Sequence, residues 1–124
     1  MAFSMLLTAA LAASLTVQTG ETWLFRVAHG RPVEAQRVIA TAAPAPGQIK
    51  LAAKRMMGTL LTLTNNSRVA YTYRATLVGS DGKAIVAKSC VLPAGNRLVM
   101  ESWPQVAIAV EVGDFRPTRD ARCR

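Results

Sequence analysis

The sequence predicts an all-β protein, a two-sheet antiparallel sandwich of about seven short strands. The clearest indication is GTLLTLTNNSRVAYTYRATLVGSDGKAIVAKSCVLPAG, residues 58–95, where alternating apolar segments are separated by turn-forming residues. Turn signals recur about every ten residues through the rest of the chain, as in sandwich domains. A chain of 124 residues is long enough for one domain with its own core. A small barrel is the alternative that the same pattern allows.

The N-terminal segment has the composition of a secretory leader. Residues 1–20 carry no charged side chain, residues 5–13 form an apolar run, and Ala10, Leu11 and Ala12 fit a small-x-small cleavage site. We therefore expect a signal peptide over residues 1–13, cut near Ala12 or Ala13, and a periplasmic or secreted protein. A transmembrane helix would need about 20 apolar residues, and polar residues interrupt the run too early. A core helix is the remaining alternative.

The predicted sandwich domain covers residues 21–116 and begins with an alternating strand. In ETWLFRVAHG, residues 21–30, Trp23, Phe25 and Val27 share one side. Later strands are bounded by turn signals such as APAPGQ, NNS and GSDG, which supply proline, asparagine and glycine where the chain must reverse. These later strands are expected at residues 33–42, 49–57, 59–65, 69–78, 83–91, 97–103 and 106–115.

The inward positions of these strands give the expected core. The strand at residues 69–78 is the most regular, with its odd-numbered residues from Val69 to Leu77 facing inward. Trp103, followed by Pro104, is expected to cap one end of the sandwich. The expected core is Trp23, Phe25, Val27, Leu61, Leu63, Tyr71, Tyr73, Leu77, Val86, Val99, Ile108 and Val110.

Residues 58–103 carry a family resemblance in their turn chemistry. The matching features are the turn at Asn65, Asn66 and Ser67, the Asp81-Gly82 pair, and the turn at residues 92–95. In these features the chain resembles bacterial extracytoplasmic immunoglobulin-like domains of the FxLYD type. The resemblance implies an immunoglobulin-like, or fibronectin III-like, sandwich. It also implies a small adaptor or binding domain of the cell envelope rather than an enzyme.

Residue types that carry catalysis or bind metals are few. His29 is the single histidine and has no cysteine or carboxylate beside it, so we expect an exposed histidine in a turn. The thioethers of Met56, Met57 and Met100 suit copper(I), but no histidine accompanies them, and we expect methionines that fill the core. We expect no cofactor and no metal.

Two further patterns resemble catalytic motifs. GSDG, residues 79–82, lacks the G-x-S-x-G spacing of a nucleophile elbow and is expected to be a hairpin turn. Glu101 and Glu111 would form a carboxylate pair if their strands were neighbours; ion pairs with the many Lys and Arg residues are the preferred interpretation. We expect that the protein is not an enzyme and has no small-molecule substrate.

The chain has two cysteines, Cys90 and Cys123. In an oxidising compartment we expect them to form a disulfide, and the loop that it closes would contribute roughly 3–4 kcal/mol. The alternative is a buried Cys90 and a thiol in the tail. No C-x-x-C motif indicates a redox or zinc site.

Positive charge is the strongest remaining feature. Fifteen Lys and Arg residues outnumber seven Asp and Glu, for a net charge of +8. Nucleic acid is disfavoured as a partner because the chain has few aromatic residues for base stacking. An unknown protein, an anionic envelope component or a peripheral membrane contact remains. The candidate contacts are Lys50, Lys54, Arg55, Arg74, Lys83, Lys88 and Arg116, together with Arg119 and Arg122 of a basic tail at residues 117–124.

Together these observations predict a small exported binding or accessory module of the bacterial cell envelope. The composition, rich in alanine and arginine, favours a bacterial source. We expect contact with a protein partner through an exposed sheet edge and the basic surface. The alternative is a structural envelope protein that associates non-specifically with anionic polymers or lipid head groups.

Overall fold

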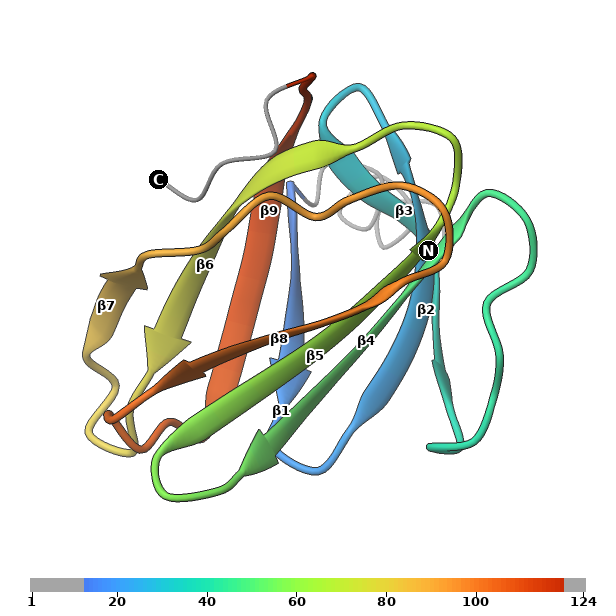
Figure 1. Ribbon diagram of the computed structural model, residues 1–124. Coiled ribbons are helices and arrows are strands. Elements are labelled where there is room, and N and C mark those ends of the chain that lie inside the picture. Colours follow the sequence, from blue (N-terminus) through green and yellow to red (C-terminus); the bar gives the residue numbers. More distant parts are fainter. Residues whose placement is uncertain (1–12, 120–124) are drawn as a thin grey trace, which may run out of the picture.

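The computed structural model describes residues 13–119, which fold into two antiparallel β-sheets with no helix (Figure 1). The all-β prediction with two antiparallel sheets is confirmed, but the expected count of about seven strands is too low. The nine strands are β1 (Ser14–Gln18), β2 (Thr22–Ala28), β3 (Arg31–Val38), β4 (Gln48–Arg55), β5 (Thr59–Asn66), β6 (Tyr71–Val78), β7 (Ala84–Ala87), β8 (Leu98–Trp103) and β9 (Ala109–Pro117).

The strands divide into a four-stranded sheet of order β1-β9-β6-β7 and a five-stranded sheet of order β3-β2-β4-β5-β8. The hairpins β2–β3, β4–β5 and β6–β7 each stay within one sheet. The chain crosses from one sheet to the other after β1, β5, β7 and β8. In Figure 1, β8, β5 and β4 run across the layer that contains β6, β9 and β1.

The core lies between the two sheets, where every second side chain of a strand points inward. In β5 the buried Leu61 and Leu63 alternate with the partly exposed Thr62 and Thr64. Phe115 of β9 packs against three other rings, at centroid distances of 5.6 Å to Phe25, 6.0 Å to Tyr71 and 5.8 Å to Tyr73. The buried cluster is Leu15, Val17, Phe25, Ile49, Leu51, Ala53, Leu61, Leu63, Tyr73, Ala75, Leu77, Leu92, Ala107, Val110, Val112 and Phe115.

Most of the expected core positions are buried or half-buried, but several are not. Val86 and Ile108 are exposed, so their assignment to the core is wrong. Val86 lies on an edge strand opposite Thr76, on the outer face of the sheet, and Ile108 lies in the loop before β9. Val69 is also exposed because β6 begins two residues later, and Val99 is only half-buried.

The first strand was not expected. Ser14–Gln18 pairs with β9 from Gly113 to Ala109 and buries Leu15 and Val17 in the core. Its alternation of Leu15 and Val17 with Thr16 and Gln18 is a strand pattern, but the uncharged composition of residues 1–20 hid it. The sandwich therefore begins before residue 21, while residues 1–12 of the expected leader lie outside the described part.

The expected strand at residues 83–91 is shorter than predicted. After β7 the chain leaves the ladder with β6, and the Ser89 hydroxyl donates a hydrogen bond to the Tyr73 carbonyl at 2.9 Å. An isolated bridge pairs Tyr71 with Leu92. The chain from residue 88 to residue 97 thus passes from the four-stranded sheet to the edge of the five-stranded sheet, where β8 begins.

Candidate binding edge and basic surface

Four strands lie at sheet edges: β1 and β7 in one sheet, β3 and β8 in the other. An edge strand has a row of backbone N–H and C=O groups that can pair with another chain. Proteins protect such edges with charges, proline, bulges or covering segments. Comparing the four edges therefore shows where a partner strand can add.

The β3 edge is protected by its sequence and by its irregular backbone. Pro32 has no N–H to donate, and Glu34 adopts a left-handed conformation with φ of 51°. The pairing register with β2 shifts at this point. Arg37 adds an exposed charge and forms an ion pair with Glu21 at 3.3 Å. A regular ladder with a partner is not available here.

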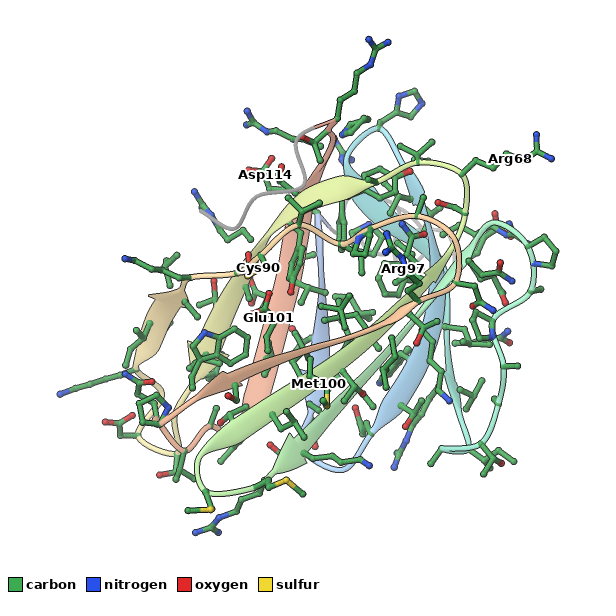
Figure 2. The ribbon with its side chains drawn as sticks, in the orientation of Figure 1. Arg68, Cys90, Arg97, Met100, Glu101 and Asp114 are labelled. Atoms are coloured by element: carbon green, nitrogen blue, oxygen red, sulfur yellow. The ribbon has the colours of Figure 1, made fainter. Side chains whose placement is uncertain are left out.

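The β8 edge is linked to the preceding segment of the chain. The carboxylate of Glu101 accepts a hydrogen bond from the backbone N–H of Cys90, and Figure 2 shows Glu101 pointing toward Cys90. Trp103 Nε1 donates to the Lys88 carbonyl at 2.9 Å. These two bonds fix residues 88–90 against β8. A partly buried charged side chain on an edge strand, such as the Glu101 carboxylate, also protects that edge from pairing with another chain.

The β1 edge offers little apolar contact. Its exposed side chains, Thr16 and Gln18, are polar, whereas Leu15 and Val17 are already buried in the core. A partner strand at β1 would gain backbone hydrogen bonds without burying new apolar surface.

The β7 edge has none of these protections. Ala84–Ala87 contains no charge, no proline and no left-handed residue. Ile85 is 49% exposed and Val86 is 67% exposed. Both are β-branched residues, which favour strand pairing. Lys83 and Lys88 lie directly before and after the strand. An apolar strand with an open edge is a template for another strand.

The β6–β7 hairpin fixes β7 in register. Gly79 N–H donates to the Lys83 carbonyl at 2.9 Å, and Gly82 N–H donates to the Gly79 carbonyl at 3.0 Å. Gly82 has φ of +82°, which glycine adopts without steric cost. This is a three-residue hairpin loop that ends in a glycine bulge. The Asp81 carboxylate accepts the Lys83 N–H at 3.0 Å and tightens the turn further.

The hairpin geometry shows which backbone groups of β7 face outward. Gly79 and Lys83 form a hydrogen-bonded pair, and bonded and non-bonded pairs alternate along an antiparallel ladder. Leu77–Ile85 is therefore a bonded pair, whereas Val78–Ala84 and Thr76–Val86 are not. The N–H and C=O groups of Ala84 and Val86 accordingly point to the open side.

A basic hollow lies at the end of β7. It has a volume of about 420 Å³ and is bordered by β6, β9 and residues 86–91. Three of the predicted contacts line it: Arg74, Lys88 and Arg116. Arg116 forms an ion pair with Asp114 at 3.1 Å, while Arg74 and Lys88 form no ion pair with any residue between 13 and 119. Uncompensated positive charge therefore lies beside the open edge.

The other predicted basic contacts do not line this hollow. Lys50 and Lys54 line a second hollow of about 220 Å³ on the five-stranded sheet. Lys50 Nζ donates to the Ala40 carbonyl at 2.6 Å. Arg55 is exposed at the end of β4, Lys83 lies in the β6–β7 hairpin, and Arg119 is exposed after β9. Arg122 lies outside the described residues.

The remaining candidate groups do not converge on a catalytic centre. His29 is exposed in the β2–β3 turn. Glu101 and Glu111 lie on β8 and β9, which belong to different sheets, so the condition for the alternative of a carboxylate pair is not met. Neither residue forms an ion pair within residues 13–119, so the preferred expectation of ion pairs is wrong there. Across residues 13–119, no group of three or more His, Cys, Asp or Glu side chains is placed to hold a metal. The same stretch contains no helix long and apolar enough to cross a bilayer.

The sulfur-containing residues differ from expectation. Met56, Met57 and Met100 are all exposed, so the prediction that they fill the core is wrong. Met56 and Met57 lie in the β4–β5 turn, because β4 ends at Arg55 and not at residue 57 as expected. Met100 lies on β8, within the strand expected at residues 97–103. Cys90 is half-buried after β7. Cys123 lies outside the described residues, and the disulfide stays a prediction.

Tyr73 has the one buried side-chain polar atom in the described chain that lacks a hydrogen-bond partner, its hydroxyl. Burial of the phenol raises its pKa, and the nearby negative charge of Glu101 raises it further. Burial also raises the pKa of Tyr71. Tyr73 thus belongs to the core, as expected, with its hydroxyl held neutral.

Comparison with known proteins gives no match to a family model, a curated protein or a solved structure. The function is therefore argued from the geometry of the chain alone.

The sequence did not indicate two features of the site. The Glu101–Cys90 hydrogen bond joins residues eleven positions apart across a chain reversal, and no local motif marks it. The open edge of β7 follows from strand order, which periodicity does not determine. A usable signal was the run Ala84-Ile85-Val86-Ala87 between two lysines, because apolar strands flanked by charges often need protection from pairing.

Proposed function

We propose that this chain is an exported, non-enzymatic binding module of the bacterial cell envelope that receives one strand of a protein partner on the β7 edge. The observation that carries the proposal is that β7 is apolar, exposed and unprotected, whereas the β3 and β8 edges are protected. Strand addition gives affinity through main-chain hydrogen bonds and specificity through alternate side chains.

The basic residues beside β7 support a role in encounter. Lys83 and Lys88 flank the strand, and Arg74 lines the hollow at its end. Positive charge at a binding edge speeds association with an acidic surface and contributes less to final affinity. The backbone ladder then provides the part of the interaction that salt does not screen.

The finer fold assignment, an immunoglobulin-like sandwich, is supported by connectivity. β5 pairs with β8 and β6 pairs with β9, as strands B with E and C with F do in immunoglobulin-like domains. β7 takes the place of the additional strand beside C. β1 takes the place beside β9 where the last strand of such a domain lies. β2 and β3 extend the other sheet.

Export is supported by the position of the first strand. β1 begins at Ser14, directly after the cleavage site expected near Ala12 or Ala13. Cleavage there would leave every core residue of β1 in the mature protein. A Cys90–Cys123 disulfide would then form in the oxidising compartment and connect the tail to the segment after β7.

The second candidate function is a structural envelope protein that binds anionic polymers or lipid head groups through charge alone. It is favoured by one observation, the spread of basic residues over both sheets rather than at one site. Salt distinguishes the two functions, because exposed charge contacts are screened within a Debye length of about 10 Å at 0.1 M salt.

Affinity capture from envelope extract tests the proposal. The mature protein, from residue 14 onward, is immobilised beside a Val86→Pro variant and washed at low and high salt. Proline at Val86 removes an outward N–H without breaking a bond to β6. We expect one discrete protein to remain at high salt on the wild type and to be lost on the variant.

The matched control is Ile39→Ser, which removes a comparably exposed apolar side chain outside the β7 edge. Its capture should equal that of the wild type. Thermal unfolding checks that Val86→Pro remains folded, and Val86→Lys gives a second block of the edge without a backbone change. Elution of all material at high salt would leave only the charge-based function.

A further inference from the structure

One end of the molecule presents apolar side chains on the tips of its loops. The β1–β2, β4–β5, β6–β7 and β8–β9 turns all lie at this end, the lower end in Figure 1. We call Met56, Met57, Val106 and Ile108 the apolar end; they are 61%, 99%, 52% and 53% exposed. Exposed single apolar residues are common in proteins, but a group of four is a candidate contact surface.

Hydrogen bonds hold these loops together. The buried Thr59 hydroxyl donates to the Gln105 carbonyl at 2.7 Å and accepts the Ala107 N–H at 2.9 Å. Thr19 N–H donates to the Ile108 carbonyl at 2.9 Å. The β8–β9 loop is therefore fixed to both the β4–β5 hairpin and the β1–β2 turn. The apolar end is a preformed surface.

Met57 is held in a conformation that a methionine does not favour. Its φ of 51° lies in the left-handed region, and its side chain is almost fully exposed. Glycine or asparagine would occupy this turn position with less strain. Within the described chain the side chain gains almost no packing. Packing within the described residues therefore does not account for a methionine at this position.

The charges around the apolar end are mostly positive. Lys54 and Arg55 directly precede the methionines, and Lys83 lies in the neighbouring β6–β7 hairpin. The nearby Asp81 carboxylate accepts the Lys83 N–H. Glu21 accepts hydrogen bonds from Trp23 Nε1 and Gln18 N–H. Protruding apolar side chains flanked by cations fit the interfacial zone of a bilayer with anionic head groups.

We propose that the apolar end docks on a lipid bilayer surface and inserts Met56, Met57, Val106 and Ile108 at the boundary between head groups and acyl chains. Lys54, Arg55 and Lys83 contact the anionic head groups. The proposal is independent of strand addition at β7, because the two share only Lys83, the apolar residues differ, and the key variant leaves the β7 edge intact.

The opposite end supplies an internal comparison. Arg68 and Arg97 are exposed there on loops joined by the Gly95 N–H to Ser67 carbonyl bond at 3.2 Å, and Figure 2 shows both side chains. Val69, 41% exposed, is the adjacent large apolar residue. Attraction by charge alone would act at both ends, whereas insertion favours the apolar end.

Vesicle co-sedimentation of the mature protein tests the proposal. The vesicles are phosphatidylcholine with one third phosphatidylglycerol, and pure phosphatidylcholine for comparison. We expect binding to the anionic vesicles that weakens but persists at high salt. Met57→Ser should reduce the affinity by about tenfold or more, because the insertion of one large apolar side chain is lost. Ile108→Ser should act in the same direction.

The controls are Val69→Ser, which removes an apolar side chain that is 41% exposed at the opposite end, and the double variant Arg68→Gln with Arg97→Gln. Val69→Ser should bind as the wild type does, and the arginine variant should lose less than Met57→Ser. The proposal is overturned if no vesicles bind. It is also overturned if the arginine variant loses binding while Met57→Ser and Ile108→Ser retain it.

Discussion

Gly58 is the residue on which the β4–β5 turn depends most directly. Its φ is +121°, and a Cβ atom at this position would collide with the Trp103 carbonyl oxygen. The glycine therefore allows the turn to pack against the chain at Trp103 and Pro104. The sequence marked Gly58 as a boundary between two strands, but not as a site of close approach.

Gly58→Ala should destabilise the protein by about 3 kcal/mol, because both backbone strain and the collision must be relieved. Urea unfolding measures the change. Gly82→Ala is the matched control, since Gly82 also has a positive φ but open space around it; it should cost about 1 kcal/mol. Equal losses for the two variants would contradict the packing argument.

Tyr73 gives the protein a defined sensitivity to alkaline pH. Its phenol is buried without a hydrogen-bond partner, and its pKa is raised above the ordinary value of 10.0. A raised pKa means that the folded state holds its proton more tightly than the unfolded state. The resulting stability is complete below about pH 10 and is lost as pH rises further, by up to about 1.4 kcal/mol per pH unit.

Tyr73→Phe should remove most of this alkaline loss, since phenylalanine does not titrate. At neutral pH the variant should gain about 1 kcal/mol of unfolding free energy because an unsatisfied buried hydroxyl is removed. Urea unfolding at pH 8 and above about pH 10 measures both effects. A variant less stable than the wild type at neutral pH would show that the hydroxyl is satisfied in solution.

At the scale of elements, β1 completes the four-stranded sheet. It pairs with β9 along its whole length and buries Leu15 and Val17. Each buried aliphatic side chain contributes roughly 1.5–3 kcal/mol, and most small proteins have only about 5–15 kcal/mol in total. Losing β1 therefore removes a large share of the stability.

A chain that begins at Thr19 should fail to fold, whereas a chain that begins at Ser14 should fold fully. Circular dichroism and the dispersion of amide signals in NMR distinguish the two. The control is Thr16→Ser in the longer chain, which changes only an exposed side chain of β1 and should leave stability unchanged. A stable chain from Thr19 onward would mean that β1 is dispensable.

The positions of strands and turns along the chain were more predictable than the place of each strand in its sheet. The chain reversal after NNS, residues 65–67, and the hairpin at GSDG, residues 79–82, follow from local turn chemistry, although the first joins two sheets and is not a hairpin. The alternation in β5 follows from the pleat. The apolar pattern did not predict the exposure of β7, because Ile85 and Val86 are as apolar as core residues; only the flanking lysines pointed to it. Whether such a strand is central or at an edge depends on strand order, which is a long-range property.

At the scale of the whole molecule, the sequence predicted two antiparallel sheets but not their composition. β1 was missed because an uncharged strand and an uncharged leader look alike at residues 14–20. The exposure of Met57 and Ile108 was missed because periodicity does not show where a strand ends. The predicted basic contacts lie on both sheets and not on one surface. Spacing along the chain does not determine the sheet to which a strand belongs.

The resulting molecule has two distinct surfaces near one end. The β7 edge has backbone groups that face away from β6, and the apolar end has the exposed Met56 and Met57 in its β4–β5 turn. Under the two proposals, a membrane-docked molecule would still present the open side of β7 to a partner strand. The basic residues near both surfaces would then attract acidic partners and anionic lipids alike.

Amide hydrogen exchange of β7, followed by NMR in the free protein and with the captured partner, tests the central claim most directly. In the free protein the Ala84 and Val86 amides should exchange quickly, while Ile85 and Ala87, which pair with β6, are protected. On binding, Ala84 and Val86 should become protected. Protection that appears on β3 or β8 instead, with Ala84 and Val86 unchanged, would contradict strand addition at β7.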